Sequence, residues 1–397
     1  MKVLMIHDRY VTRGGEDEST DMEAALLREH GHALDLLEMD NRIITRSRWP
    51  RTSLDAVWSG SAYRVVQQRL RESDYDLVHV QNFFPLFSPS VHYAVKSQGK
   101  PLVQSLHNYR LLCLNGVLFR SGRICEDCVG KAVPWPGVLH GCYRGSRVGS
   151  LVVASMLTAH RTLRTWSRKV DVFVAYSEFA RDKLVQGGLP RERLIVKPNF
   201  VHPDPGRGGS QRDFVLLVGR LTEDKGILTL LEAWQQLAVP IPLKIVGDGP
   251  LGALVGDAAR KKPWIESLGR LPLSEVYDLM GRARLLVFPT RLYETFGRVV
   301  IEAFAKETPV LASEIGAGGR LVEQGRTGLH FRSGDASDLA AKVLWAWEHP
   351  EECQRMGREG RRTYEQEYSS ERNYELLMSA YETAILRNRS GENQREA

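Results

Sequence analysis

Leu285-Leu-Val-Phe-Pro-Thr-Arg-Leu-Tyr-Glu-Thr-Phe-Gly-Arg-Val-Val-Ile-Glu302 predicts a buried parallel strand that leads directly into a helix. Its first four residues are apolar, Pro289 closes them, and the residues beyond have helical spacing. Gly297 would lie near the start of that helix, where free backbone N–H groups and the positive end of the helix dipole favour an anion such as phosphate. The stretch is therefore typical of an α/β domain with a ligand site beside the strand end.

The same stretch carries two glutamates, Glu294 and Glu302. They would lie about 12 Å apart if all residues between them were helical, which is too far for them to share one proton. Each carboxylate could accept two hydrogen bonds from a diol of a ribose or a hexose. The simpler alternative is a pair of solvated helix glutamates, and a pair alone does not decide between the two.

The rest of the chain alternates strand-like and helix-like segments in two series, which predicts two doubly wound α/β domains with parallel sheets. The expected strands are Val3–His7, Ala33–Leu37, Leu77–Val80, Leu102–Leu106, Val172–Ala175, Leu194–Val196, Phe214–Val218, Leu243–Val246, Trp264–Leu268, Leu285–Phe288 and Val310–Leu311. The expected helices of the first series are Glu16–Glu29, Leu54–Arg71, Ser90–Lys96, Gly149–Trp166 and Glu178–Val185.

Glycine and proline mark the boundary between the two series. A first domain is expected over residues 1–202, a Gly- and Pro-rich linker over 203–210 and a second domain over 211–369. A helix at about 370–386 would complete the first domain, and 387–397 is expected to be a disordered tail. Two such domains predict a ligand in the cleft between them, held by loops after the strands.

Composition limits the class of protein. The 397 residues have a net charge of +6 and 43% hydrophobic residues, which is ordinary for a globular protein. No apolar run approaches the roughly 20 residues that span a bilayer, and Met1–His7 lacks the features of a signal peptide. We therefore expect a cytoplasmic protein. The basic excess suits polyanionic ligands, and no nucleic-acid-binding motif accompanies it.

Candidate phosphate and base contacts follow the strands of the second series. Arg220 offers a planar fork of donors and Lys225 a point charge, a combination suited to a diphosphate; the alternative is two surface cations in a loop. Gly247 begins a tight turn into the next helix. Backbone groups near Leu271 could contact a nucleobase edge.

The first series offers two further candidates. Gly14 and Gly15 precede a helix and would let its backbone approach an anion, or would simply form a flexible turn in front of Glu16, which suits the helix dipole without any ligand. His107 follows a strand and could contact a sugar hydroxyl or a phosphate, or be a hydrogen-bonded structural histidine.

Four of the five cysteines lie close together. Cys113, Cys125, Cys128 and Cys142 have the spacing C-x11-C-x2-C-x13-C. In a cytosolic chain this pattern suits a structural tetrathiolate zinc site, and the alternative is reduced thiols that pack a loop.

Two stretches combine basic and apolar residues, which suits an anionic membrane surface or, equally, helices with solvated basic faces. The first, residues 41–71, contains Arg42, Arg46, Arg48, Trp49, Arg51 and Trp58. The second, residues 143–169, contains Arg144, Arg147, Arg161, Arg164, Arg168 and Lys169.

Together these motifs resemble, over nearly the whole chain, the retaining glycosyltransferases of family 4 ("group 1"), which have the GT-B fold. The segments that carry the resemblance are Gly14–Glu16, Gly219–Gly226, Gly247–Pro250, Glu294–Glu302, Val310–Ala317 and Gly325–Leu329. The segment His107–Cys128 resembles a bacterial branch of that family associated with surface-polysaccharide assembly. The donor would then be a nucleoside-diphosphate sugar of the UDP or GDP type, and the acceptor a saccharide or lipid-linked saccharide.

The resemblance implies a role for each residue of the opening stretch. Glu302 would bind the ribose hydroxyls, and Glu294 would contact the donor sugar together with the backbone N–H groups of Phe296 and Gly297. Arg298 stands where many members of the family have an apolar residue, which bears on the identity of the donor more than on the reaction.

The resemblance also implies how the leaving group is handled. Arg220 and Lys225 would hold the diphosphate, helped by the turn at Gly14 and Gly15, and His107 would touch the donor sugar near the transferred carbon. No metal would take part, because fixed cations and dipoles stabilise the phosphate. Retention would follow from attack on the face that the phosphate leaves.

Two other functions are compatible with these residues. A sugar-nucleotide 2-epimerase shares the architecture and would need no acceptor. A non-catalytic subunit that only binds a partner is a further alternative, although the presence of Arg220, Lys225, Glu294 and Glu302 argues against it.

Overall fold

The structure is a computed structural model that describes residues 1–11, 13–43, 49–209 and 212–396, without the side chains of 49–51 and 392–396. The chain forms two compact units. The first comprises Met1–Leu118, Glu126–Pro198 and the chain from Asn373 onward, and the second comprises Phe119–Cys125 and Asn199–Arg372. Among the described residues, no helix is both long and apolar enough to cross a membrane.

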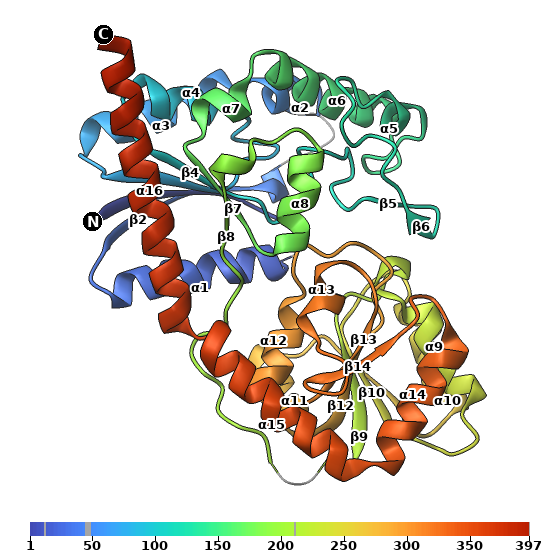
Figure 1. Ribbon diagram of the computed structural model, residues 1–397. Helices are drawn as coiled ribbons and strands as arrows, with labels where there is room; N and C mark the ends of the chain where they lie inside the picture. The colour runs from blue at the N-terminus through green and yellow to red at the C-terminus, as the bar shows by residue number, and fades with distance from the viewer. Residues whose placement is uncertain (12, 44–48, 210–211, 397) are drawn as a thin grey trace. The chain divides into compact units, whose positions relative to one another are not determined.

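The first unit is a parallel sheet with helices on both faces. Its strands, in the spatial order β2-β1-β3-β4-β7-β8, are β1 (Lys2–Arg9), β2 (Ala33–Asp40), β3 (Leu77–Asn82), β4 (Leu102–Ser105), β7 (Val172–Ala175) and β8 (Leu194–Val196). Its helices are α1 (Gly15–Glu29), α2 (Trp49–Val57), α3 (Gly60–Glu72), α4 (Ser90–Ser97), α5 (Trp135–Leu139), α6 (Arg147–Thr162), α7 (Thr165–Lys169), α8 (Glu178–Gln186) and most of α16 (Ser370–Glu396). Figure 1 shows α1 and α16 on one face of the sheet, with α3 and α4 on the other.

The second unit has the same plan with a different strand order. Its parallel strands, in the order β11-β10-β9-β12-β13-β14, are β9 (Phe214–Val218), β10 (Leu243–Val246), β11 (Ile265–Gly269), β12 (Ala283–Phe288), β13 (Val310–Ser313) and β14 (Gly328–Phe331). Its helices are α9 (Ile227–Gln236), α10 (Gly252–Lys261), α11 (Leu273–Arg282), α12 (Arg298–Ala305), α13 (Gly316–Leu321), α14 (Ala336–Glu348) and α15 (Pro350–Glu367). A short hairpin of β5 (Phe119–Arg120) and β6 (Arg123–Ile124) is assigned to this unit.

Burial of β-branched and leucine side chains between sheet and helices stabilises each unit. In the first unit, Val3 and Met5 of β1 pack with Leu377 and Tyr381 of α16, all fully buried. In the second unit, the fully buried Trp234 of α9 belongs to the core cluster that covers one face of the sheet. Helices cover both faces of each parallel sheet, so the strands are apolar throughout. Continuous apolar runs in the sequence therefore predicted these strands.

Two expected helices are each divided in the structure, and one strand was not expected. The expected helix Gly149–Trp166 is divided into α6 and α7, because Arg164 between them has a φ of 54°. The expected helix Leu54–Arg71 is two helices, because Ser59 has extended backbone and its Oγ accepts a hydrogen bond from Ala62 N at 3.3 Å, which starts α3. The strand β14 was not among the expected strands, because its four residues begin with a glycine and include His330.

The last helix is longer than the expected helix at about 370–386. Helix α16 continues past residue 386 through Glu396. Arg387 Nη1 donates to Asp171 O at 3.0 Å, and Asn388 Nδ2 donates to Gly99 O at 2.7 Å. These bonds extend the packed part of the helix beyond the apolar residues that defined it in the sequence.

The segment expected to be a linker packs on the second unit. Asp204 accepts two hydrogen bonds from the Arg361 guanidinium, at 2.8 and 2.6 Å. Lys306 Nζ donates to Pro205 O at 3.0 Å and to Arg207 O at 3.2 Å. Residues 203–207 are therefore anchored by side chains of α12, α15 and their connections.

Candidate active site

The second unit places its charged loops at one topological switch point. β9 and β12 are neighbours while the chain leaves them toward opposite edges of the sheet, so their carboxyl ends form a topological switch point, the usual ligand position in a doubly wound sheet. The loop after β9 carries Arg220 and Lys225, and the loop after β12 carries Glu294. The predicted strand-end positions of these residues agree with the structure.

Lys225 and Glu294 are in direct contact. Lys225 Nζ donates to Glu294 Oε1 in an ion pair, and Thr290 Oγ1 donates to the same oxygen at 3.3 Å. Gly226, with a φ of 75°, allows this approach, because a Cβ there would lie 1.8 Å from Pro289 O. Two residues that are 69 positions apart in the sequence thus share one site.

Glu302 and Arg298 lie one turn apart on α12. Arg298 Nε donates to Glu302 Oε1 at 2.8 Å, and Glu302 is 6% exposed. Gly297 caps the helix with a φ of 114°, as the stretch predicted for the helix start. Phe296 is buried and its ring meets Tyr368 edge-on, so its side chain packs while its backbone precedes the helix.

The backbone N–H of Gly247 is already hydrogen-bonded within the sheet. Its N–H donates to Gly269 O at 2.8 Å, and a Cβ would lie 1.8 Å from Gly219 O. The glycine therefore joins the ends of neighbouring strands, and its N–H is not available to a phosphate. Arg220 is exposed, and Leu271 lies half-buried between β11 and α11.

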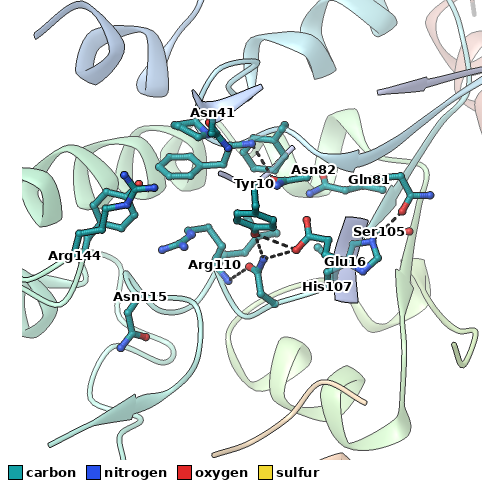
Figure 2. Close-up of a pocket in the computed structure, with 18 residues that line it drawn as sticks. Tyr10, Glu16, Asn41, Gln81, Asn82, Ser105, His107, Arg110, Asn115 and Arg144 are labelled. Carbon is teal, nitrogen blue, oxygen red and sulfur yellow. Dashed lines mark hydrogen bonds between the residues drawn. The ribbon is translucent and has the colours of Figure 1, made fainter. Parts of the chain in front are cut away.

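The first unit has its own switch point, between β1 and β3. A pocket lies there, and Figure 2 shows side chains from the ends of β1, β3 and β4 around it. Gly14 caps α1, and its N–H donates to Asp17 Oδ2 at 3.0 Å within the same helix. Gly15 has no heavy atom within 4 Å of the position that a Cβ would take.

His107 lines this pocket as a neutral group. Burial lowers the pKa of His107 to about 3, so the ring carries no charge near neutral pH. Its Nε2 lies 2.9 Å from Gln81 Oε1 and 2.9 Å from the Tyr176 hydroxyl. Gln81 is itself oriented, since its Nε2 donates to Glu23 Oε1 at 2.6 Å. His107 is thus built to hydrogen-bond and not to act as a cation.

Glu16 is the functional candidate that the sequence did not identify. Its Oε2 accepts from the Tyr10 hydroxyl at 3.0 Å and from Asn108 Nδ2 at 3.4 Å, as the dashed lines in Figure 2 show. Burial raises the pKa of Glu16 to about 8. The signal was present in the Gly-Gly-Glu run at a strand end, but a glutamate in the first turn of a helix is also favourable without any ligand.

The zinc prediction is not supported. Among the residues that the structure describes, no three His, Cys, Asp or Glu side chains are grouped as metal ligands. The Cys113 thiol donates to Asn115 Oδ1 at 2.9 Å, and the Cys128 thiol donates to Pro134 O at 3.7 Å. Both cysteines are buried, so their side chains pack this segment.

The two basic stretches use their arginines differently. Arg42 pairs with Asp40 at 2.5 Å, whereas Arg46, Arg48 and the side chains of Trp49 and Arg51 lie outside the described residues. On α6, Arg161 Nη2 donates to Leu111 O at 2.7 Å. Arg161 therefore holds the segment around Leu111 in place and is not a solvated surface cation.

Comparison with known proteins gives consistent matches. Residues 14–205 match the family described as Glycosyltransferase Family 4, and residues 205–363 match Glycosyl transferases group 1. The chain is 25% identical over 269 residues to the uncharacterized glycosyltransferase MJ1178 of Methanocaldococcus jannaschii, which covers 67% of this chain and 71% of that protein. It is 33% identical over 204 residues to D-rhamnosyltransferase WbpZ of Pseudomonas aeruginosa, which covers 50% of this chain and 52% of that protein.

Solved structures share the fold. The crystal structure of Alr3699/HepE from Anabaena in complex with UDP superimposes with a TM-score of 0.69 at 18% identity, and the match covers 96% of this chain and 100% of that chain. This likeness, with two doubly wound parallel sheets, confirms the predicted GT-B fold.

Proposed function

We propose that this chain, whose two halves match glycosyltransferase families, moves a hexose-type sugar from a nucleoside diphosphate to a saccharide acceptor with retention at the transferred carbon. The observation that carries the proposal is the contact between Lys225 and Glu294 at the switch point of the second unit. It joins one group suited to a phosphate and one suited to sugar hydroxyls, which are the two adjacent parts of a nucleotide sugar.

The donor replaces this internal ion pair when it binds. Its diphosphate pairs with Lys225 and with the exposed Arg220, and a hydroxyl of its sugar donates a hydrogen bond to the Glu294 carboxylate. Because each partner of the pair gains a ligand group, neither side chain is left without a hydrogen-bond partner. The ribose diol donates hydrogen bonds to the carboxylate of Glu302, in which Arg298 Nε donates to Oε1 and not to Oε2.

Departure of the diphosphate is then assisted by fixed charges. The bond from the transferred carbon to the phosphate oxygen breaks while the acceptor oxygen forms a new bond to that carbon, and the acceptor proton passes to the departing phosphate. Arg220 and Lys225 stabilise the negative charge that develops on it, without a metal. His107 is neutral and hydrogen-bonded, so it transfers no proton.

A nucleoside diphosphate of the UDP or GDP type fits this site. The Anabaena protein was solved with UDP and also with UDP-glucose. The D-rhamnosyltransferase and the O-antigen chain mannosyltransferase among the relatives favour a role in cell-surface polysaccharide synthesis, with a lipid-linked acceptor. We place that reaction in the cytoplasm, at the inner face of an anionic membrane. Salt-sensitive sedimentation of the protein with anionic liposomes tests the membrane contact, and its absence would remove it.

Product analysis tests the transferase proposal. The purified protein is supplied with labelled nucleotide sugars, with and without a saccharide acceptor, and the products are separated and their anomeric configuration is read by NMR. We expect a new glycoside with the donor's configuration, formed only when the acceptor is present. Release of a free epimerised sugar without acceptor would favour the 2-epimerase, and the absence of any nucleotide-sugar binding by calorimetry would favour a non-catalytic subunit.

A further inference from the structure

The pocket of the first unit carries polar groups that donor binding in the second unit does not use. It lies at the carboxyl ends of β1, β3 and β4, and Figure 2 shows the side chains that face it. The lining residues that carry the argument are Glu16, Asn41, Phe84, Arg110, Tyr143 and Arg144. Three of them come from the segment between β4 and α6, which lies outside the regular βα alternation.

Two oxygen atoms around this pocket are buried without a hydrogen-bond partner among the described residues. They are Glu16 Oε1 and Asn41 Oδ1. Asn41 is 3% exposed, so its side chain has little contact with bulk solvent. A buried polar atom that lacks a partner destabilises the folded protein, and such an atom in a pocket is explained when a ligand supplies the missing bond. Two unpaired oxygens at one pocket therefore point to a ligand with hydroxyl groups.

Arginine and aromatic side chains form another part of the same pocket. The Arg110 guanidinium lies 5.3 Å from the ring centroid of Phe84 and 5.3 Å from that of Tyr143. The Arg144 guanidinium lies 5.4 Å from the Tyr143 ring on its own loop. Arg144 has a φ of 52°, in the left-handed region that arginine seldom adopts, so the loop holds it in a strained conformation.

The charge of the pocket is not balanced internally. No salt bridge joins Arg110 or Arg144 to a carboxylate among the side chains that the structure describes. Among the described residues that line the pocket, Glu16 carries the one carboxyl group. Since burial raises the pKa of Glu16 to about 8, that group is mostly neutral at pH 7 and leaves both arginine charges uncompensated.

We infer that this pocket binds an acidic sugar, with its carboxylate or phosphate group held by Arg110 and Arg144 and its hydroxyls directed to Glu16 and Asn41. The sugar ring packs against Tyr143, because apolar sugar faces fit aromatic rings, and a planar guanidinium binds a carboxylate or phosphate with two parallel bonds. The inference rests on the proposed function, since the acidic sugar is the terminal residue of the acceptor. It adds a substrate class that the proposed transfer reaction alone does not require.

Calorimetric titration without any donor tests the inference directly. The probes are glucuronic acid, glucose 6-phosphate and glucose, which separate a carboxylate from a phosphate and both from an uncharged ring. We expect at least one acidic sugar to bind about tenfold or more tightly than glucose, and Arg144→Gln and Arg110→Gln each to remove about that factor. Arg168→Gln is the matched control, because Arg168 is exposed on α7 of the same unit and does not line the pocket.

Three results would overturn the inference. The first is equal affinity for glucose and both acidic sugars, and the second is the same loss of affinity in the Arg168→Gln control. The third is displacement of the bound acidic sugar by UDP or GDP, which would make the pocket part of the donor site. A separate titration with nucleotide sugars keeps the two proposals apart: donor binding without acidic-sugar binding refutes only this inference, whereas acidic-sugar binding without donor binding refutes the proposed transfer.

Discussion

Arg298 and Glu302 form an ion pair one turn apart on α12, with 2.8 Å between Arg298 Nε and Glu302 Oε1. Because both side chains are about nine-tenths buried, removing one partner leaves a charge with little access to water. We expect Arg298→Met and Glu302→Gln each to lower the free energy of unfolding by about 3 kcal/mol, and the double variant to lower it by clearly less than the sum. Urea denaturation of the four proteins measures this coupling.

The matched control for that cycle is the Arg326–Glu323 pair, whose side chains are about half exposed. An exposed pair of this kind couples by about 0.5 kcal/mol or less. A coupling at Arg298 and Glu302 no larger than that of the control would contradict the structural role of the buried pair.

The contact between Lys225 and Glu294 makes a prediction about catalysis. Lys225→Ala removes a fixed charge at the departing phosphate, and Glu294→Gln removes the carboxylate at the sugar. We expect each to lower kcat/KM by about 100- to 1,000-fold with the fold unchanged by circular dichroism. Lys244→Ala is the control, since Lys244 pairs with Glu266 on neighbouring strands of the same sheet. Wild-type transfer by both site variants would show that the site is elsewhere.

His107 predicts a particular pH profile. Because burial lowers the pKa of His107 to about 3, its protonation contributes no inflection to kcat/KM between pH 5 and pH 8. His107→Gln keeps hydrogen-bonding groups and is expected to retain about tenfold more activity than His107→Ala. An inflection near pH 6.5 that disappears in His107→Gln would contradict a neutral role for this histidine.

Burial of Glu16 makes stability fall as the solution becomes alkaline. Its pKa is about 8 in the folded chain and 4.5 ordinarily, so the folded state binds more protons between these values and the free energy of unfolding falls as pH rises through them. Burial also raises the pKa of Asp8 to about 7, which lowers the free energy of unfolding with rising pH in the same way. Burial lowers the pKa of His79 and His92 to about 4, which makes stability rise with pH up to about 6.5. Between pH 7 and pH 8 the Glu16 contribution therefore dominates.

We expect Glu16→Gln to remove this decline, which amounts to at most about 1.4 kcal/mol per pH unit for one proton. Chemical denaturation at pH 6.5, 7 and 8 measures it. Asp21→Asn is the control, because Asp21 is a part-exposed carboxylate of the same helix that pairs with Arg9. An equal slope in wild type and Glu16→Gln would show that Glu16 is already ionised at pH 7.

The end of α16 contributes to the stability of the first unit. Lys96 Nζ donates to Asn388 Oδ1 at 2.7 Å, and Arg387 and Asn388 donate to backbone carbonyls of the same unit. Truncation after Leu386 removes these bonds and is expected to lower the melting temperature by several degrees. Truncation after Ser390 keeps them and serves as the control. Equal melting temperatures for the two truncated chains would mean that the last helical turns are not anchored.

Local patterns predicted most of the fold, because strands covered on both faces are apolar throughout and their ends carry glycine and proline. They were enough for β12, α12 and the position of Glu294 after a strand. Local patterns failed where residues distant in the sequence determine the environment of a side chain or the end of a helix. Glu16 acquires its raised pKa from burial beside Tyr10, and the tail after Leu386 is held by residues some 200 to 300 positions earlier.

The cysteine cluster failed for a related reason. A C-x2-C spacing is compatible with zinc, but the thiols of Cys113 and Cys128 meet oxygen acceptors that nearby backbone and side chains supply. Spacing along the chain does not state which partner a thiol meets once the loop is folded. The same limit applied to Arg298, whose partner on the next helical turn was visible only with the helix in place.

The buried ion pair between Lys197 and Glu23, 2.8 Å apart, also involves Asn373, which accepts from Lys197 Nζ at 3.0 Å. Until Asn373 and the residues after it have been added, the first unit therefore lacks part of its buried polar network. The apolar sheet face that α16 covers is also exposed until then. On the ribosome, every residue of the second unit leaves the exit tunnel before Asn373 and the rest of α16 do. The unit whose synthesis begins first is thus the one whose folding is completed last, with its open sheet face in need of protection in the meantime.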